Sequence, residues 1–162
     1  MKACGKVHKY GDNVDTDVII PARYLNTPDM QELAQHCMED IDVDFAKNVQ
    51  KGDIMVAKSN FGCGSSREQA PEIIKHLNIR CVIAKSFARI FFRNSINNGL
   101  LLIENKDIPD AVREGDELTV IMNDKITFNG KDYPIEPLPD NLMEILNAGG
   151  LVKAMQKRNG LV

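Results

Sequence analysis

The sequence lacks tryptophan and long hydrophobic runs, and it has few aromatic residues. Aromatic side chains make up only 6% of the 162 residues. No run approaches the roughly 18 apolar residues that a membrane-spanning helix needs, and residues 1–8 lack the apolar core of a signal peptide. We therefore expect a cytoplasmic protein that has no contact with a membrane.

A surplus of basic residues is also absent. The 20 lysines and arginines are outnumbered by 23 aspartates and glutamates, which gives a formal net charge of −3. Proteins that bind nucleic acid usually carry a basic surplus or a basic stripe, so we expect no nucleic-acid partner. An anionic ligand of this chain must be bound by a few local cations.

The sequence has none of the spacings typical of a metal site. Its four cysteines, Cys4, Cys37, Cys63 and Cys81, form no C-x-x-C pair, and no two histidines lie three to five residues apart. We therefore expect that this chain by itself binds no metal and no cofactor. In a reducing compartment the cysteines are predicted to be free thiols, with Cys63 a small filler residue rather than a nucleophile.

The overall composition is that of a globular protein. Hydrophobic residues make up 43% and charged residues 27% of the chain. A chain of this length can bury about two thirds of the surface that its unfolded form exposes. No repeat or linker is visible, so we expect a single domain over residues 1–162.

The most informative stretch is residues 59–68, SNFGCGSSRE. It follows the strand-like run 54–58 and precedes a helical pattern over 68–77, so it is typical of a glycine-rich turn from a strand to a helix. Backbone N–H groups at such a helix start can bind an anion, and Ser65, Ser66 and Arg67 lie at this point. A purely structural interpretation is also open, because Ser65 and Glu68 match the S-x-x-E capping box.

Alternating elements follow this turn. The pattern predicts a strand over 79–85, a helix over 87–97 with Ser86 as its cap and Asn98-Gly99 at its end, and a strand over 100–104. This order predicts an α/β fold with parallel strands, whose ligands bind at the carboxyl ends of the strands. Arg89 and Arg93 share one face of the predicted helix, and we interpret them as solvated surface cations.

The first fifty residues are less regular. We expect a strand over 2–8. Asp15 and Asp17 serve either turn chemistry or a buried hydrogen-bond network before a β-branched run that Pro21 ends. Thr27 and Pro28 predict the start of a helix over 29–38, on which His36 is a surface or hydrogen-bonded residue. Residues 39–51 are expected to be irregular.

The last third is predicted to be antiparallel. Strands are expected over 118–122, 125–128 and 131–135, with a hairpin turn at Asn129-Gly130. Helices are expected over 141–147 and 151–158, separated by Gly149-Gly150. The whole chain is thus predicted to form a mixed sheet with a parallel βαβ core and antiparallel C-terminal strands.

Several blocks together carry a resemblance that spans essentially the whole chain. They are DTDVIIP (15–21), YLNT (24–27), NFGCGSSRE (60–68), KSFARIF (85–91), NNGL (97–100) and AGGL (148–151). In this order they resemble the small subunits of 3-isopropylmalate dehydratase, in their short bacterial and archaeal form, within the aconitase superfamily.

The resemblance implies a swivelling β/β/α domain that closes over a separate large subunit. That partner would carry a [4Fe–4S] cluster and most ligands of a small dicarboxylate substrate, in a heterodimer or heterotetramer. The implied reaction is that of a hydro-lyase, which isomerises 2-isopropylmalate and 3-isopropylmalate by dehydration and rehydration in leucine biosynthesis.

The resemblance also implies roles for individual residues. Ser65 would be the general base as an alkoxide, with Ser66 and Arg67 beside it and Arg67 binding a substrate carboxylate through its planar fork. Asp17 occupies the position of an active-site aspartate.

A second segment is implied to bind the substrate's side arm. It comprises Arg23, Tyr24, Leu25, Asn26 and Thr27. Related homoaconitases place an arginine where Asn26 stands, so an uncharged residue fits an isopropyl arm better. Homoaconitase-type or citramalate-type substrates stay open, as does a stand-alone phosphate-binding module, although the P-loop spacing is absent.

Overall fold

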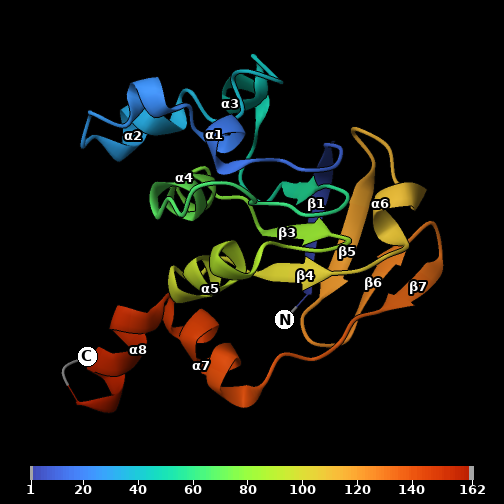
Figure 1. Ribbon diagram of the computed structural model, residues 1–162. Coiled ribbons are helices and arrows are strands. Elements are labelled where there is room, and N and C mark those ends of the chain that lie inside the picture. Colours follow the sequence, from blue (N-terminus) through green and yellow to red (C-terminus); the bar gives the residue numbers. More distant parts are fainter. Residues whose placement is uncertain (1, 161–162) are drawn as a thin grey trace.

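The computed structural model describes residues 2–160 and contains one seven-stranded sheet (Figure 1). The strands are β1 (Lys2–Lys9), β2 (Ile54–Val56), β3 (Cys81–Ala84), β4 (Leu102–Glu104), β5 (Glu117–Ile121), β6 (Lys125–Phe128) and β7 (Lys131–Pro134). The helices are α1 (Thr16–Ile19), α2 (Met30–Ala34), α3 (Phe45–Asn48), α4 (Gln69–His76), α5 (Arg89–Asn97), α6 (Ile108–Ala111), α7 (Asp140–Ala148) and α8 (Leu151–Arg158), with a 3₁₀ turn η1 (Ala22–Tyr24).

The sheet has a parallel half and an antiparallel half that share β1. The strand order is β4-β3-β2-β1-β5-β6-β7. Val7 to Lys9 of β1 pair with β2 in parallel, whereas Lys2 to Lys6 pair with β5 in the antiparallel sense. The predicted mixed sheet is therefore confirmed, as is the hairpin turn, where Asn129 and Gly130 both have positive φ.

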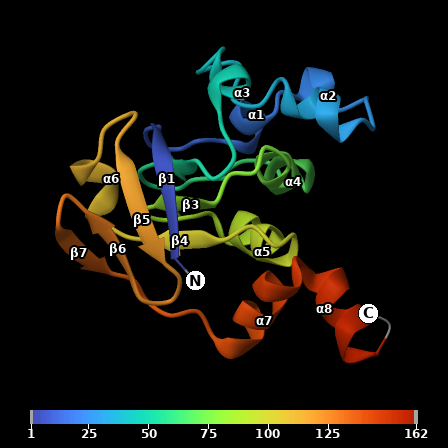
Figure 2. The ribbon, with the colours of Figure 1, turned by 180° about the vertical axis from the view of Figure 1, so that it is seen from behind.

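Alternation along the parallel strands produces a hydrophobic core on each face. Met55 of β2 and Val82 of β3 belong to one core, whereas their neighbours Ile54 and Ile83 belong to the other. Successive side chains of a strand point to opposite faces, so strands that are buried on both sides read as continuous apolar runs. Figures 1 and 2 show α4 and α5 gathered on one side of the molecule and the antiparallel strands on the other.

Two predicted helix starts are wrong because other contacts use the capping side chains. Ser86 does not cap α5: its hydroxyl accepts the N–H of Asn60 at 2.8 Å, and α5 starts at Arg89. Thr27 does not cap α2: the carboxylate of Asp29 accepts the N–H of Gln31 at 3.0 Å and takes that place.

Three short helices were not predicted, and one predicted helix is shorter than expected. The segment 39–51, expected to be irregular, contains α3, and α1 and α6 also lie outside the predicted elements. The predicted helix 29–38 ends at Ala34. Met38 has a positive φ of 61° and donates its N–H to the carbonyl of Ile19, so a long-range bond draws the chain out of the helix.

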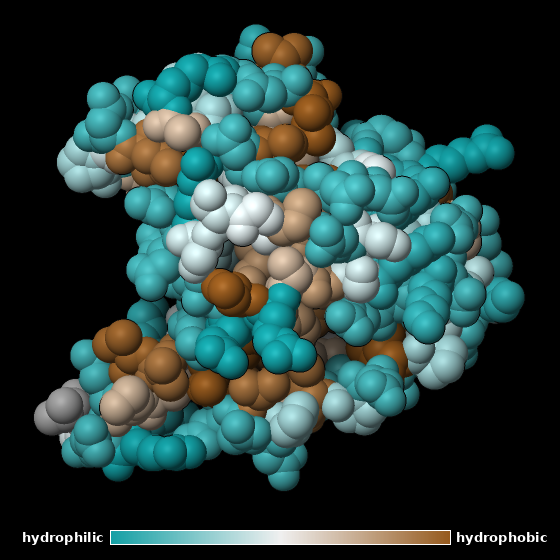
Figure 3. All heavy atoms as spheres, viewed as in Figure 1, coloured by the Kyte–Doolittle hydropathy of each residue, from teal (hydrophilic) through white to brown (hydrophobic). Residues whose placement is uncertain are grey.

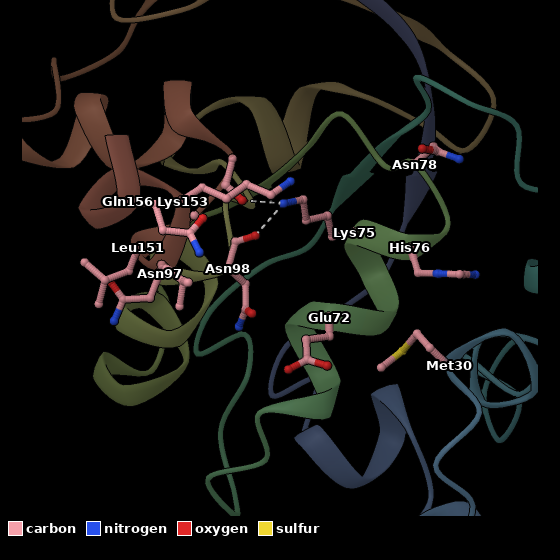
Figure 4. A pocket seen from close by; sticks show the side chains of 13 residues that line it. Met30, Glu72, Lys75, His76, Asn78, Asn97, Asn98, Leu151, Lys153 and Gln156 are labelled. Carbon is pink, nitrogen blue, oxygen red and sulfur yellow. Dashed lines mark hydrogen bonds between the residues drawn. The ribbon is translucent and has the colours of Figure 1, made fainter. Parts of the chain in front are cut away.

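Lysine 75 joins the C-terminal helices to the rest of the fold. Its ammonium group donates to the carbonyl oxygens of Asn98 and Gly149, at 2.7 and 2.8 Å. Figure 4 shows the Lys75 side chain extending from α4 toward Asn98. Burial and the nearby charge of Lys153 lower the pKa of Lys75. Lys75 lines a cavity of about 650 Å³ between α4 and α8, visible as the hollow on the left of Figure 3.

Most of the face seen in Figure 3 is hydrophilic, with apolar groups over α8 and near the top. The large apolar side chains with the most exposure are Ile41, Val43, Ile90, Leu151, Val152 and Met155. No helix within residues 2–160 has both the length and the apolar character needed to cross a membrane.

Candidate active site

The serine turn, residues Phe61–Arg67, follows β2 and is held by backbone bonds to the segment before α1. The N–H of Gly62 donates to the carbonyl of Val14 at 2.7 Å, and the N–H of Thr16 donates to the carbonyl of Cys63 at 2.8 Å. The Thr16 hydroxyl also donates to the carbonyl of Ser65 at 2.7 Å. The turn therefore has a fixed backbone at the carboxyl end of a parallel strand, where ligands of such sheets bind.

Two glycines allow this close packing. Gly62 and Gly64 have φ values of 82° and 92°. A Cβ on Gly62 would lie 2.1 Å from the ring of Phe91, and a Cβ on Gly64 would lie 2.6 Å from the carboxylate of Asp15. Because any side chain would both clash and favour another φ, only glycine fits at either position.

The capping-box interpretation of Ser65 is wrong. Helix α4 begins at Gln69, Glu68 occupies the N-cap position, and no side chain caps the helix. Ser65 and Ser66 are exposed instead. The two hydroxyls are therefore free of a capping role and accessible to a ligand.

The serine turn and the start of α5 enclose a small cavity of about 230 Å³, called here the serine cavity. Ser65, Ser66 and Arg67 line it together with Thr16, Gly62, Gly64, Ala88, Arg89, Ile90, Phe91 and Asn94. Three of the four residues predicted to be catalytic thus share one cavity, and the fourth, Asp17, does not line it.

Asp17 instead pairs with Arg67. One carboxylate oxygen of Asp17 accepts from the Arg67 guanidinium at 2.8 Å and from the N–H of Ala22 at 3.0 Å. These bonds, the one from Arg67 first, lower the pKa of Asp17. Arg67 also donates to the carbonyl of Ile20 at 3.0 Å through the same nitrogen. Its orientation is therefore fixed, while its other guanidinium nitrogens are left for a ligand.

Asp15 has a different function from Asp17. Its carboxylate accepts the N–H of Asp17 at 2.7 Å and caps α1. The turn-chemistry interpretation therefore holds for Asp15. The expected buried hydrogen-bond network is wrong for Asp17, whose carboxylate is exposed although it bonds Arg67 and Ala22.

The predicted side-arm segment, residues Arg23–Thr27, is held by a cluster of charged side chains around Glu39. The Tyr24 hydroxyl donates to Glu39 at 2.6 Å, and the Arg23 guanidinium bonds Glu39 at 3.1 Å and Asp40 at 2.7 Å. His36 stacks on the Tyr24 ring and bonds Glu39 at 2.9 Å, which confirms that it is a hydrogen-bonded residue. Bonds from Tyr24, then His36 and Arg23, lower the pKa of Glu39 to about 2.

The structure does not bring the side-arm segment into the serine cavity. Among the described residues, the cavity is lined by none of Arg23, Tyr24, Leu25, Asn26 and Thr27. Leu25 is half-buried and Asn26 is exposed, and Thr27 donates to Glu32 at 3.2 Å. The link between the two regions is Asp17, whose one oxygen accepts from both Arg67 and Ala22.

The cysteines do not form a metal site. No cluster of three or more potential metal ligands occurs in the part of the chain that the structure describes. Cys37 and Cys81 are buried and Cys4 is exposed, on different elements, and all four thiols are free. Burial and then the charge of Asp15 raise the pKa of the Cys63 thiol, which opposes a role as nucleophile. Residues 2–160 therefore bring together no ligand set that could hold an iron–sulfur cluster.

The start of α5 is the part of the cavity that sequence reasoning did not assign. Arg89, Ile90 and Asn94 line it, although Arg89 had been interpreted as a solvated cation. The sequence could have indicated these three residues. They follow β3, so they lie at the same edge of the sheet as the serine turn.

Comparison with known proteins shows the family to which the chain belongs. The aconitase C-terminal domain profile matches residues 23–108. The 3-isopropylmalate dehydratase small subunit of Lachnospira eligens is 61% identical and covers 99% of this chain and 98% of its own length. That of Helicobacter hepaticus is 56% identical, with 98% of each covered. The chain belongs to the family of 3-isopropylmalate dehydratase small subunits.

A solved structure of the same family has the same fold. The crystal structure of 3-isopropylmalate dehydratase from Methanocaldococcus jannaschii is 48% identical, has a TM-score of 0.94, and covers 99% of this chain and 97% of that one. The family resemblance and the aconitase-type fold are thus confirmed.

Proposed function

We propose that this chain is the small subunit of a 3-isopropylmalate dehydratase, a hydro-lyase that interconverts 2-isopropylmalate and 3-isopropylmalate in leucine biosynthesis. The observation that carries the proposal is the serine cavity, where two exposed hydroxyls and an oriented guanidinium meet. The full-length similarity to small subunits of that name supports the substrate.

Ser65 is the proton acceptor in this proposal. Dehydration removes a proton from a carbon next to a carboxylate, and a free serine hydroxyl is far too weak an acid to be ionised for that task. Hydrogen-bond donors and positive charge at the turn stabilise the alkoxide, each donor contributing about 3 kcal/mol. The bond from Thr16 to the carbonyl of Ser65 fixes the backbone that carries this hydroxyl.

Arg67 binds a substrate carboxylate. Its contacts with Asp17 and Ile20 use one nitrogen, Nη1, so the other two nitrogens can donate to two carboxylate oxygens. Asp17 acts through Arg67 in this scheme, as a positioning residue.

The partner in this proposal is a large subunit that carries a [4Fe–4S] cluster. The cluster would supply a Lewis acid for the leaving hydroxyl. Because the described residues of this chain offer no cluster ligands, the partner must provide them. We further propose that the side-arm segment contacts the isopropyl arm when the two subunits close on each other.

Reconstitution tests the proposal. The chain is mixed anaerobically with a 3-isopropylmalate dehydratase large subunit, and the alkene intermediate is followed by its absorbance. We expect no activity from either subunit alone and activity from the mixture. A mixture that acts on no malate homologue, or nucleotide binding by this chain alone, would contradict the proposal.

Ser65→Ala tests the assignment of the base. We expect kcat to fall about 1,000-fold, as for the loss of a general base. The matched control is Ser59→Ala, a serine before the turn that does not line the cavity. A loss of only a few-fold for Ser65→Ala, with normal folding and assembly, would show that Ser65 is not the base.

A further inference from the structure

The serine cavity contains a second guanidinium that the proposed function leaves without a role. Arg67 comes from the serine turn and Arg89 is the first residue of α5. Arg67 is oriented by Asp17, whereas Arg89 is exposed and, within residues 2–160, makes no side-chain hydrogen bond or ion pair. Arg89 is therefore free to meet a charged ligand.

Within residues 2–160, Arg89 gives the cavity lining a positive charge that no ion pair offsets, whereas the charge of Arg67 is paired with Asp17, which lies outside the lining. Two arginines line it, and no aspartate or glutamate does. The first turn of α5 contains no acidic residue, and Ala88 at the N-cap provides no side-chain acceptor. The N–H groups of a first helical turn lack intrahelical partners and carry partial positive charge, which adds to that of Arg89. The lining therefore offers donors to two anionic groups, one through the guanidinium nitrogens of Arg67 that Asp17 leaves free and one through Arg89.

A malate-type substrate carries two carboxylates, and a single guanidinium fork pairs with one of them. On the basis of the proposed function, we propose that Arg89 binds the second substrate carboxylate while Arg67 binds the first. Arg89 is then a substrate-binding residue, and the two arginines fix the orientation of the reacting carbons relative to Ser65.

A neighbouring cavity offers a different location for the Arg89 side chain. Arg89 also lines a cavity of about 830 Å³ that includes Lys85 and lies beside β4. Glu104 and Glu136 also line that cavity, so it already holds carboxylates that oppose the binding of an anion. The serine cavity has no such carboxylate in its lining, and this difference favours it as the place where Arg89 meets an anion.

Arg89→Ala in the reconstituted enzyme tests the inference. Its matched control is Arg93→Ala, which removes an exposed arginine one turn along the same helix that does not line the cavity. We expect KM for 2-isopropylmalate to rise about tenfold or more in Arg89→Ala, because charge-assisted hydrogen bonds are lost, and to stay within about twofold in Arg93→Ala. Arg89→Lys should be intermediate, and added guanidinium ion should partly restore the alanine variant.

The ligand's charge provides the second readout. Inhibition by a competitive dicarboxylate should weaken in Arg89→Ala, whereas inhibition by the matching monocarboxylate should not. Equal KM values for Arg89→Ala and Arg93→Ala, or equal weakening of both inhibitors, would overturn the inference while an active wild-type enzyme leaves the proposed function intact. An inactive wild-type mixture would overturn both.

Discussion

The serine turn and the side-arm segment are built by different forces. The serine turn is fixed by backbone hydrogen bonds to Val14 and Thr16 and by glycines in close contact with neighbouring groups. The side-arm segment is held by charged and hydroxyl side chains that converge on Glu39 at the surface. The comparison indicates that the region proposed for proton transfer tolerates no change in shape, whereas the region proposed for selectivity can be altered by single side chains.

After Ser65→Ala, the largest effect is expected from Gly64→Ala. The added Cβ meets the Asp15 carboxylate and the residue must keep a φ of 92°, which costs about 1–3 kcal/mol of stability. Displacement of Ser65 by about 1 Å should lower kcat about 100-fold. Gly11→Ala is the control, since no atom lies within 4 Å of a Cβ there. Urea unfolding and steady-state kinetics measure both effects, and equal behaviour of the two variants would show that the turn is not rigid.

Arg67→Lys should have the next largest effect. Lysine keeps the charge but cannot hold Asp17, Ile20 and a carboxylate with one planar group, so kcat/KM should fall about 10- to 100-fold. Arg80→Lys, at an exposed arginine before β3, should leave kcat/KM unchanged. If Arg67→Lys behaves like its control, the fork geometry is not needed.

Asn26→Arg should alter selectivity more than rate. An arginine beside an alkyl arm stays unpaired, so the preference for isopropylmalate over a homoaconitate-type substrate should fall about tenfold. Asn26→Gln, which lengthens the side chain without charge, should keep the preference. If the ratio of kcat/KM values for the two substrates is unchanged in Asn26→Arg, the side-arm segment does not determine specificity.

Glu39→Gln should have the smallest effect on activity, a change of about threefold in KM, because it loosens the segment without touching the serine turn. It should also change the response to pH. The pKa of Glu39 is lowered from 4.5 to about 2 in the fold, so its contribution to stability is full above pH 4.5 and is lost as the pH falls toward 2.

Thermal unfolding at several pH values measures this second effect. The Tm difference between the wild type and Glu39→Gln should be largest above pH 4.5 and should shrink at lower pH. Glu32→Gln is the control, because the Glu32 carboxylate accepts a hydrogen bond from Thr27 and lies outside the cluster around Glu39. A Tm difference that does not depend on pH would contradict the proposed cluster around Glu39.

Much of the fold could be predicted because its signals are local. The apolar runs of β2 to β4, the Asn129-Gly130 hairpin and the break at Gly149-Gly150 each depend on residues next to one another. The two wrong helix caps concern serines, whose hydroxyls can serve either as a cap or in another role. Ser86 looked like a helix cap and bonds Asn60, and Ser65 looked like a cap and is free.

The sequence by itself determined the order of the elements and the position of Ser65, Ser66 and Arg67 at the end of a parallel strand, because strand alternation and glycine turns are properties of short stretches. Only the tertiary structure decided which distant groups meet these residues. Asp17 reaches Arg67 across 50 positions of sequence, and Arg89 comes from the next strand-to-helix connection. These contacts depend on which strands are neighbours in the sheet. A pattern within a short stretch of sequence does not predict that order.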